Sequence, residues 1–480
     1  MPATSTSRTH RLVAKQALQP LARRAGRLAW LVWIVATWLI ATAWPSAWAQ
    51  ATQPPTEPVL RIEAGMHTAV IRGISNDAQG RWAVTASVDK TARVWDVASG
   101  RLLQVLRPPL GAGDEGKLYA AAMSPDGAVV AVAGWTGHEW TGKVEVYLFN
   151  RSTGQLIRRL GGLPNVINHL AFSPDGRWLA AGLSKRNGVR VWRWADGSAP
   201  MLDAGYGGDS YGAHFGPAGP AGQPLVTSSW DGQVRLYRLA ANAAPGSAIQ
   251  PVQAVAATGG KRPFGVAFSP DGRLVAVGYH DSTRVDVLDG SSLALRYSPS
   301  TVGMGNGSLM SVAFSADGQT LAAGGLWNVN GMFPVRRWPQ AGQGQPQDTP
   351  TAGNSLQSLA PLPGGGWLVG AGDPAWGQLQ ADGRWLLRGQ PPTADLRGST
   401  GDSAFLLADS GRMLQFGYEP SGKAPHQFDL RQRRLSAGAL SGGQPPRTQG
   451  LAVEGWANTT RPTLNEIGRA SCRERVYSSV

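Results

Sequence analysis

Histidine is the residue type in this chain best suited to metal binding or acid–base chemistry. None of the histidines that follow the basic N-terminal segment stands four residues from another, the spacing that pairs two metal ligands on one helix face. The pairs His138-Glu139 and His280-Asp281 would need ligands from distant parts of the chain to complete a metal site. We therefore predict no metal and no cofactor. These histidines are His67, His138, His169, His214, His280 and His426.

No other pattern in the chain supports catalysis. The glycine run Gly364-Gly365-Gly366 is not followed by Lys and Ser or Thr, so it lacks the residues of a phosphate-binding loop. A single cysteine, Cys472, excludes a disulfide framework and a multi-cysteine zinc site. No catalytic residues are predicted, and we expect a protein that is not an enzyme.

The composition indicates a large all-β protein. The chain has 480 residues, more than the ~250–300 at which one hydrophobic core typically stops growing. Hydrophobic residues make up 42% and include 19 Trp, which excludes a disordered chain. With 63 Gly, 34 Pro and only 16% charged residues, the chain favours many short strands joined by turns.

A repeated turn motif organises the middle of the chain. Ser-Pro-Asp-Gly occurs at residues 124–127, 173–176 and 269–272, and Ser-Ala-Asp-Gly at 315–318, each between two short apolar stretches. Degenerate copies begin at 75, 216 and 361, so seven copies are spaced 43 to 53 residues apart. Pro fixes φ and Asp-Gly favours a tight turn between antiparallel strands. Four strands per copy cannot bury both faces alone, which predicts a closed β-propeller rather than an open solenoid.

The first copy carries a family resemblance. The run from Ser87 to Asp96, which ends in Trp-Asp, resembles the core of a WD40 repeat, and Gly65-Met66-His67 stands where that family has Gly-His. The resemblance implies a WD40-like propeller of about seven four-stranded blades. It also implies a buried hydrogen-bonded tetrad with a structural role, formed by His67, Ser87, Asp89 and Trp95.

Aromatic residues recur after the second strand of several copies. Because these loops occupy equivalent positions, a propeller would bring them to one rim, where they could stack on a peptide, on a glycan ring or on an apolar side chain of a partner. The alternative is that they pack between blades. The candidate rim residues are Trp135, Trp140, Trp230, Tyr279, Trp327 and Trp376.

The N-terminal segment reads as an export signal. Six basic residues lie in the first 27, an apolar run of 17 residues extends from Leu28 to Trp44, and Ala47-Trp48-Ala49 precedes Gln50. This order predicts cleavage between Ala49 and Gln50 and a periplasmic protein. The alternative is an uncleaved inner-membrane anchor facing the periplasm, since ~17 apolar residues can just span a bilayer. The membrane is then a partner only through this segment.

The C-terminal residues 466–480 are expected not to be native. The run from Glu466 to Val476 resembles the in-frame translation of a short-read sequencing adapter. The formal charge of the whole chain is +14, and it falls to +7 without the six basic leader residues and the single net positive charge of this tail. Such a charge is ordinary for a solvated surface, so nucleic acid is not an expected partner.

The predicted organisation follows from these segments. We expect a signal peptide or anchor at 1–49, a linker at 50–59, the propeller at 60–390, and a strand-rich segment at 391–435 that closes the ring or adds a blade. A Gly/Pro/Arg-rich linker at 436–465 precedes the tail at 466–480.

The predicted function is an exported, non-catalytic scaffold that binds a protein or peptide, with a glycan as a further ligand class. The leader and propeller together also resemble the N-terminal part of bacterial exported WD40 proteins that continue into a caspase-like peptidase domain. The alternative function is therefore the recognition half of such a peptidase, with its catalytic domain missing from this chain. A propeller enzyme with a site in its central channel is a weaker alternative.

Overall fold

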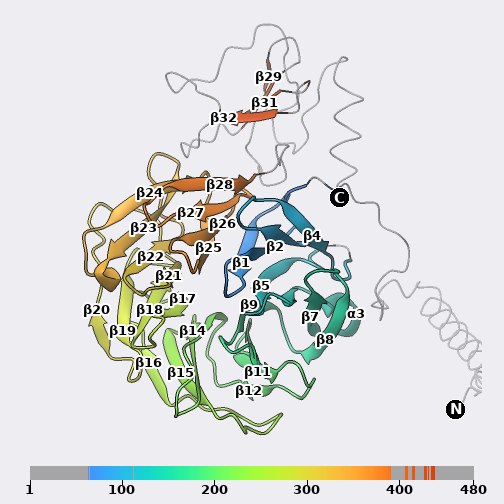
Figure 1. The fold of residues 1–480 in the computed structure, drawn as a ribbon, viewed down its shortest axis with the longest axis vertical. Helices are drawn as coiled ribbons and strands as arrows, with labels where there is room; N and C mark the ends of the chain where they lie inside the picture. The colour runs from blue at the N-terminus through green and yellow to red at the C-terminus, as the bar shows by residue number, and fades with distance from the viewer. Residues whose placement is uncertain are drawn as a thin grey trace, which may run out of the picture. The chain divides into compact units, whose positions relative to one another are not determined.

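The computed structural model describes residues 63, 65–111 and 113–390, and also 406–408, 413–416, 426–429, 431 and 434–437. Between residues 71 and 389 the chain forms seven four-stranded antiparallel sheets, each built from four consecutive strands in sequence order. Figure 1 shows them as blades around a common centre, and we number them blades 1 to 7 in chain order. The chain is therefore an all-β propeller of seven four-stranded blades.

The first four blades contain β1 (Ile71–Asn76), β2 (Trp82–Ser87), β3 (Ala92–Asp96), β4 (Leu102–Leu106); β5 (Leu118–Met123), β6 (Val129–Gly134), β7 (Val144–Asn150), β8 (Leu156–Leu163); β9 (Ile167–Phe172), β10 (Trp178–Leu183), β11 (Val189–Arg193), β12 (Met201–Asp203); and β13 (Ser210–Phe215), β14 (Gln223–Ser229), β15 (Gln233–Leu239), β16 (Gln253–Ala256). The last three contain β17 (Pro263–Phe268), β18 (Leu274–Tyr279), β19 (Val285–Asp289), β20 (Leu295–Tyr297); β21 (Ser311–Phe314), β22 (Thr320–Gly324), β23 (Phe333–Pro339), β24 (Gln347–Ala352); and β25 (Leu356–Pro361), β26 (Trp367–Ala371), β27 (Trp376–Leu379), β28 (Trp385–Gly389). A short helix α3 (His138–Thr141) lies in blade 2, and a 3-10 turn η1 (Gln340–Gly342) lies in blade 6.

The Ser-Pro-Asp-Gly motif forms the turn between the first two strands of a blade. In blade 3, the Ser173 hydroxyl donates to Asp175 Oδ1 at 2.6 Å and accepts the Trp178 N–H at 2.9 Å. Gly176 adopts a φ of 73°, in the left-handed region that glycine enters without strain. The same Ser–Asp hydrogen bond recurs in blades 2, 5 and 6. Local turn chemistry therefore sets the hairpin that begins each of these blades.

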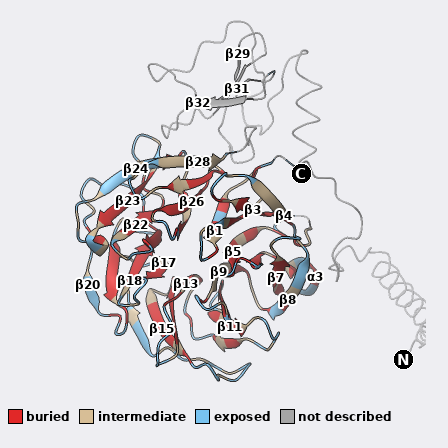
Figure 2. Cartoon of the chain, in the orientation of Figure 1, coloured by how far each residue is buried: buried red, intermediate tan, exposed pale blue. Residues whose placement is uncertain are grey.

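Burial falls from the second strand of a blade to its outer edge. All six residues of β6 are buried, whereas the outer strand β16 is mostly exposed. Figure 2 shows this gradient as red strands toward the centre and paler strands at the circumference. Clusters of apolar side chains fill the spaces between consecutive blades, so each blade has its core on both sides.

The ring closes by packing between blades 1 and 7. β1 contacts both β25 and β26, and no strand is exchanged between the two sheets. The Ile74 N–H donates to Ser358 Oγ at 3.3 Å. Farther out, the rings of Trp95 and Trp376 lie 5.2 Å apart between centroids, within one buried apolar cluster. Side-chain packing thus takes the place of a shared strand.

The strand-rich segment forms a sheet of its own. β29 (Leu406–Ala408), β30 (Met413–Phe416), β31 (His426–Asp429) and β32 (Arg434–Ala437) pair in sequence order. They therefore supply no closing strand to blade 7, which contradicts the ring-closure alternative. The predicted signal or anchor at 1–49, the linker at 50–59 and the tail at 466–480 lie outside the described residues. So does the predicted linker at 436–465, apart from Ser436 and Ala437, which end β32. In the part of the chain that the structure describes, no helix has the length and apolar character needed to cross a membrane.

The closure predicts a large stability effect for Trp376→Ala. This indole is 0% exposed, and its removal leaves a cavity between blades 7 and 1, which typically costs about 3–5 kcal/mol. Urea titration monitored by circular dichroism measures the change in the free energy of unfolding. Trp135→Ala is the control, because Trp135 is only half-buried in a loop of blade 2. If both substitutions lower the free energy of unfolding equally, the stability of the ring does not depend on Trp376 packing between blades 7 and 1.

Candidate functional site

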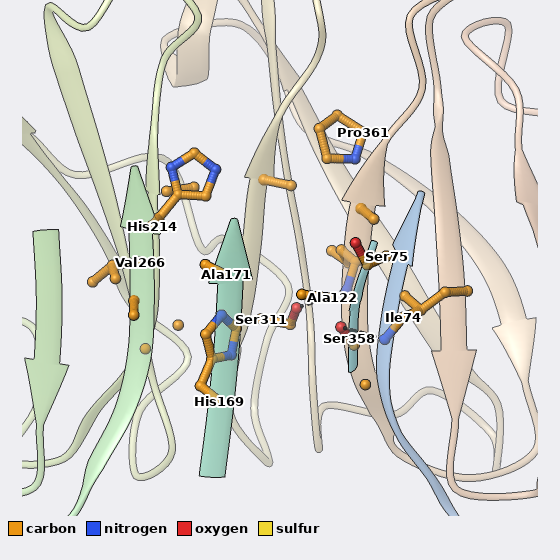
Figure 3. A pocket seen from close by; sticks show the side chains of 18 of the residues that line it. Ile74, Ser75, Ala122, His169, Ala171, His214, Val266, Ser311, Ser358 and Pro361 are labelled. Carbon is orange, nitrogen blue, oxygen red and sulfur yellow. Dashed lines mark hydrogen bonds between the residues drawn. The ribbon is translucent and has the colours of Figure 1, made fainter. Parts of the chain in front are cut away.

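A channel of about 920 Å³ runs through the centre of the ring. The first strand of every blade contributes to its wall, and Figure 3 shows several of the side chains that line it. At one end, which we call the channel mouth, each first strand begins and the second and third strands are joined. At the other end lie the turn prolines, including Pro125, Pro174 and Pro270.

Small side chains keep this channel open. Most alternate positions of the inner strands hold Gly, Ala or Ser, so the seven inner strands approach closely without filling the centre. At Gly265 the approach requires glycine, because a Cβ atom would lie 2.5 Å from the Met310 carbonyl oxygen of blade 6. The small wall residues include Gly73, Ser75, Ala122, Ala171, Gly265, Ala267, Ser311, Ala313, Ser358 and Ala360.

Two histidines interrupt this small-residue wall. His169 of β9 and His214 of β13 lie on neighbouring strands and line the cavity (Figure 3). His214 Nδ1 accepts the Phe268 N–H at 3.2 Å, which places the proton of the neutral ring on Nε2. Burial lowers the pKa of His169 to about 4, and burial together with His169 lowers the pKa of His214 to about 4. Both rings are therefore neutral near pH 7.

An aromatic cluster forms one side of the channel mouth, where blades 4 and 5 meet. Tyr211 stacks on Phe264, with centroids 4.7 Å apart and an interplanar angle of 19°. Tyr211 also lies 4.4 Å from the Trp230 ring, and Trp230 lies 5.2 Å from His280. All four rings line the cavity and are half-buried, so part of each ring can contact a ligand. We call these four residues the aromatic cluster.

Charged side chains lie near this cluster. The Arg262 guanidinium lies 5.1 Å from the Trp230 ring centroid, within cation–π range. Burial lowers the pKa of His280, and the nearby charges of Arg262 and Arg72 lower it further against the opposing effect of Asp281. Burial and then Asp209 raise the pKa of the Tyr211 hydroxyl above its usual range. The mouth thus combines neutral aromatic rings with cationic side chains.

The structure separates the six predicted rim residues into two groups. Trp135 and Trp230 are half-buried, and of these only Trp230 lines the channel. The other four are at most 7% exposed, so the expectation that they present their rings to a partner is wrong. Tyr279 ends β18 and Trp376 begins β27. Their rings therefore belong to the pleated sheets rather than to the loops. The four buried residues are Trp140, Tyr279, Trp327 and Trp376.

The predicted tetrad of blade 1 is present with one substitution. His67 Nδ1 lies 2.9 Å from Asp89 Oδ2, and His67 Nε2 lies 2.7 Å from Thr85 Oγ1. Trp95 Nε1 donates to the same Thr85 hydroxyl at 2.8 Å. Ser87 instead donates to the Ala69 carbonyl oxygen at 2.8 Å and accepts the Asp89 N–H.

Thr85 replaces Ser87 because of strand register. Trp95 pairs with Ala83 across β2 and β3, so Thr85 lies diagonally opposite the indole, whereas Ser87 lies at the end of β2. Burial opposes ionisation of Asp89, but His67 and hydrogen bonds from Thr91 and the Thr68 N–H hold its pKa below the usual range. The network is buried and ties the turn of blade 1 to its strands, which is a structural role.

Blade 4 has a related network built from tyrosines. The Tyr206 hydroxyl lies 2.6 Å from Thr227 Oγ1 and 2.9 Å from the Tyr237 hydroxyl. Tyr237 donates to Asp203 Oδ2 at 2.7 Å. Thr227 stands four residues before the turn residue Asp231, as Thr85 does before Asp89. This shared spacing is a sequence signal that could have identified Thr85.

Sequence reasoning missed most of the residues at the channel mouth. Tyr211 and Phe264 each stand five residues before the position where the Ser-Pro-Asp-Gly turn or its degenerate copy begins, whereas Arg72 stands three residues before residue 75, where the degenerate copy of blade 1 begins. Alignment of the copies on that turn would have placed Tyr211 and Phe264 at one level of the ring. The sequence marks His280 only as part of the pair His280-Asp281. In the described residues, no group of three or more His, Cys, Asp or Glu side chains could hold a metal ion.

The channel histidines predict a pH dependence of stability. In the unfolded chain their pKa is near 6.5, whereas in the folded protein it is about 4. Between these values the unfolded state binds protons that the native state does not, so stability falls as the pH drops through this window. Urea midpoints at about pH 7.5 and about pH 5 measure the loss.

The double variant His169→Gln/His214→Gln should lose less stability over the same pH interval. Glutamine does not titrate, and at position 214 its amide oxygen can still accept the Phe268 N–H. An unchanged difference between the two urea midpoints would refute the assignment of this pH dependence to the channel.

Comparison with known proteins identifies the repeats. The family model "WD domain, G-beta repeat" matches residues 61–96 and 154–193. The second match covers β8 of blade 2 and β9 to β11 of blade 3, so one sequence repeat extends over two blades.

Three curated relatives show the same similarity over part of the chain. A guanine nucleotide-binding protein subunit beta from Arabidopsis thaliana is 28% identical over 179 residues, which are 36% of this chain and 44% of the relative. Telomerase protein component 1 from Rattus norvegicus is 26% identical over 216 residues, 44% of this chain and 7% of the relative. The small ribosomal subunit protein RACK1y from Oryza sativa subsp. japonica is 28% identical over 109 residues, 23% of this chain and 28% of the relative.

The matched part of the chain spans less than half the length of each relative. The two segments that match the family model include strands of blades 1, 2 and 3, and the first of them contains the copy that carries the sequence resemblance. The chain therefore forms a seven-bladed β-propeller in which residues 61–96 and 154–193 match the WD40 repeat.

Proposed function

We propose that this chain is a non-catalytic scaffold that binds a segment of a partner protein at the channel mouth. The observation that carries the proposal is the aromatic cluster, whose four rings line the channel and are half-buried. Trp and Tyr supply much of the binding energy in protein interfaces because their large surfaces are rigid and lose little conformational entropy.

The relatives support a role in assemblies. Two of them are described by name as a subunit of a guanine nucleotide-binding protein and as a protein of the small ribosomal subunit. A propeller suits this role because its rigid strands hold the loops at the mouth in fixed positions. The alternative function, the recognition half of a caspase-like peptidase, would use the same mouth for docking.

Trp230→Ala tests the docking site. A library of displayed peptides is selected on the wild-type protein, and the enriched peptides are then measured by calorimetry on each variant. We expect Trp230→Ala to weaken binding at least about tenfold, as loss of a central aromatic contact does. The melting temperature should change little, because the ring is half-buried.

Trp135→Ala is the matched control. Trp135 follows the second strand of blade 2 as Trp230 follows that of blade 4, and it is also half-buried, but it does not line the channel. It should leave the affinity unchanged. If the two substitutions weaken binding equally, the partner binds the wider rim, and if neither does, the proposed docking site is wrong.

We further propose that the protein is exported by its N-terminal segment. Expression in a Gram-negative host with a C-terminal tag should yield periplasmic protein that begins at Gln50, as terminal mass spectrometry would show. Ala49→Arg should block cleavage, because the site requires a small residue. Recovery of wild-type protein with an intact leader in the membrane fraction supports the anchored alternative, and a cytoplasmic product rejects export.

A further inference from the structure

We propose that the channel mouth recognises a carboxylate group on the docked peptide through Arg72, with Arg262 as a second cation. The inference rests on the proposed function and adds the chemistry of the partner. Its basis is the uneven distribution of charge over the channel lining and the position of Arg72 in the mouth.

Only two charged residues, Arg72 and Asp77, lie among the described residues that line the channel. Asp77 is 0% exposed, and its carboxylate accepts the Arg81 and Trp82 N–H groups and the Arg81 Nε–H. Its charge is therefore compensated at the far end of the channel. Arg72 is exposed, and no carboxylate of the described residues pairs with it. The lining thus carries one uncompensated charge, which is positive and lies at the mouth.

The Arg72 side chain lies over the channel mouth. Its Nη1 donates to Gln357 Oε1 of blade 7 at 2.9 Å, which fixes one edge of the guanidinium. Its charge also lowers the pKa of Tyr119 in blade 2 and of Tyr211 in blade 4, against the larger effect of burial on both hydroxyls. Arg72 is thus within electrostatic range of blades on both sides of the channel.

The carboxylates nearest the aromatic cluster are already occupied. Asp281 accepts the backbone N–H groups of Lys261 and Arg262 at 3.0 Å each. Asp209 accepts the Lys185 N–H at 2.6 Å and the Tyr211 hydroxyl at 3.2 Å. These hydrogen bonds hold loops in place, and among the described residues neither carboxylate forms an ion pair with Arg72 or Arg262. Both guanidinium groups therefore keep N–H donors for an external anion.

A carboxylate fits this arrangement better than a neutral or cationic group. Arg72 can donate to it from the remaining guanidinium N–H groups while the adjoining apolar part of the peptide contacts Phe264 and Trp230. A lysine or arginine of the partner would instead face Arg72 and be repelled. The carboxylate could come from an acidic side chain or from a peptide C-terminus, and the two sources can be separated by experiment.

The test measures the retention of peptide pools on columns of immobilised full-length protein. The pools are acetylated heptapeptide amides with Glu, Gln or Lys fixed at the centre and an equal mixture of Gly, Ser, Phe, Tyr and Leu elsewhere. A fourth pool has central Gln and a free C-terminal carboxylate. On the wild-type column, the Glu pool should bind about tenfold more tightly than the Gln pool, which corresponds to about 1.4 kcal/mol.

Arg72→Gln should reduce this preference to less than about twofold, because the amide keeps polarity without charge. Arg273→Gln removes the same charge from an exposed turn at the opposite end of the channel, so it should keep the preference. Loss of the preference in both variants would show that net charge alone attracts acidic peptides, which would overturn the proposal. If the Gln pool with a free C-terminal carboxylate is retained more strongly than the Gln amide pool, the peptide C-terminus is a source of the recognised carboxylate.

The outcomes separate this inference from the proposed function. If the Glu and Gln pools are retained equally by the wild type and both lose retention on Trp230→Ala, carboxylate recognition is wrong and peptide docking stands. If no pool is retained more by the wild type than by Trp230→Ala, the docking site itself is wrong. Retention of the Lys pool above the Glu pool would also overturn the role of Arg72.

Discussion

Direct packing between blades 1 and 7 is the constraint on which the whole ring depends. A propeller has no core at its centre, so each blade is stable only between two neighbours, and one unfilled interface would expose two apolar faces. Here that interface holds without an exchanged strand. Trp95 against Trp376 fills its outer part, and hydrogen bonds from Arg72 to Gln357 and from the Ile74 N–H to Ser358 join its inner part.

The same closure positions the candidate site. Arg72 is the second residue of β1, and its hydrogen bond to Gln357 both joins the ring and holds the guanidinium at the mouth. The small residues of the inner strands leave the channel open behind it. The small inner residues therefore have two consequences: neighbouring blades pack tightly against each other, and the axis of the ring stays hollow.

Burial divides the polar groups of the protein by role. His67, Asp89 and Thr85 lie within a blade and satisfy one another, as buried polar groups must, and they leave nothing for a ligand. At the mouth, in contrast, Arg72 and Arg262 retain donors that no described carboxylate takes. We place binding at the mouth because the polar groups of the blade 1 network are hydrogen-bonded to one another, whereas Arg72 and Arg262 keep N–H donors that a ligand can use.

The spacing of the copies and their Pro and Asp-Gly residues predict the repeat, its turns and a ring of about seven blades. The spacing of His67, Asp89 and Trp95 predicts most of the blade 1 network, because all these features act over short range in the chain. The tertiary structure alone shows that the ring has seven blades, that Thr85 replaces Ser87, that Trp327 is buried while Trp230 faces the channel, and that Arg72 lines the same channel as the aromatic cluster. These outcomes depend on strand register and on how neighbouring blades pack, and contacts between residues hundreds of positions apart leave no local pattern in one sequence.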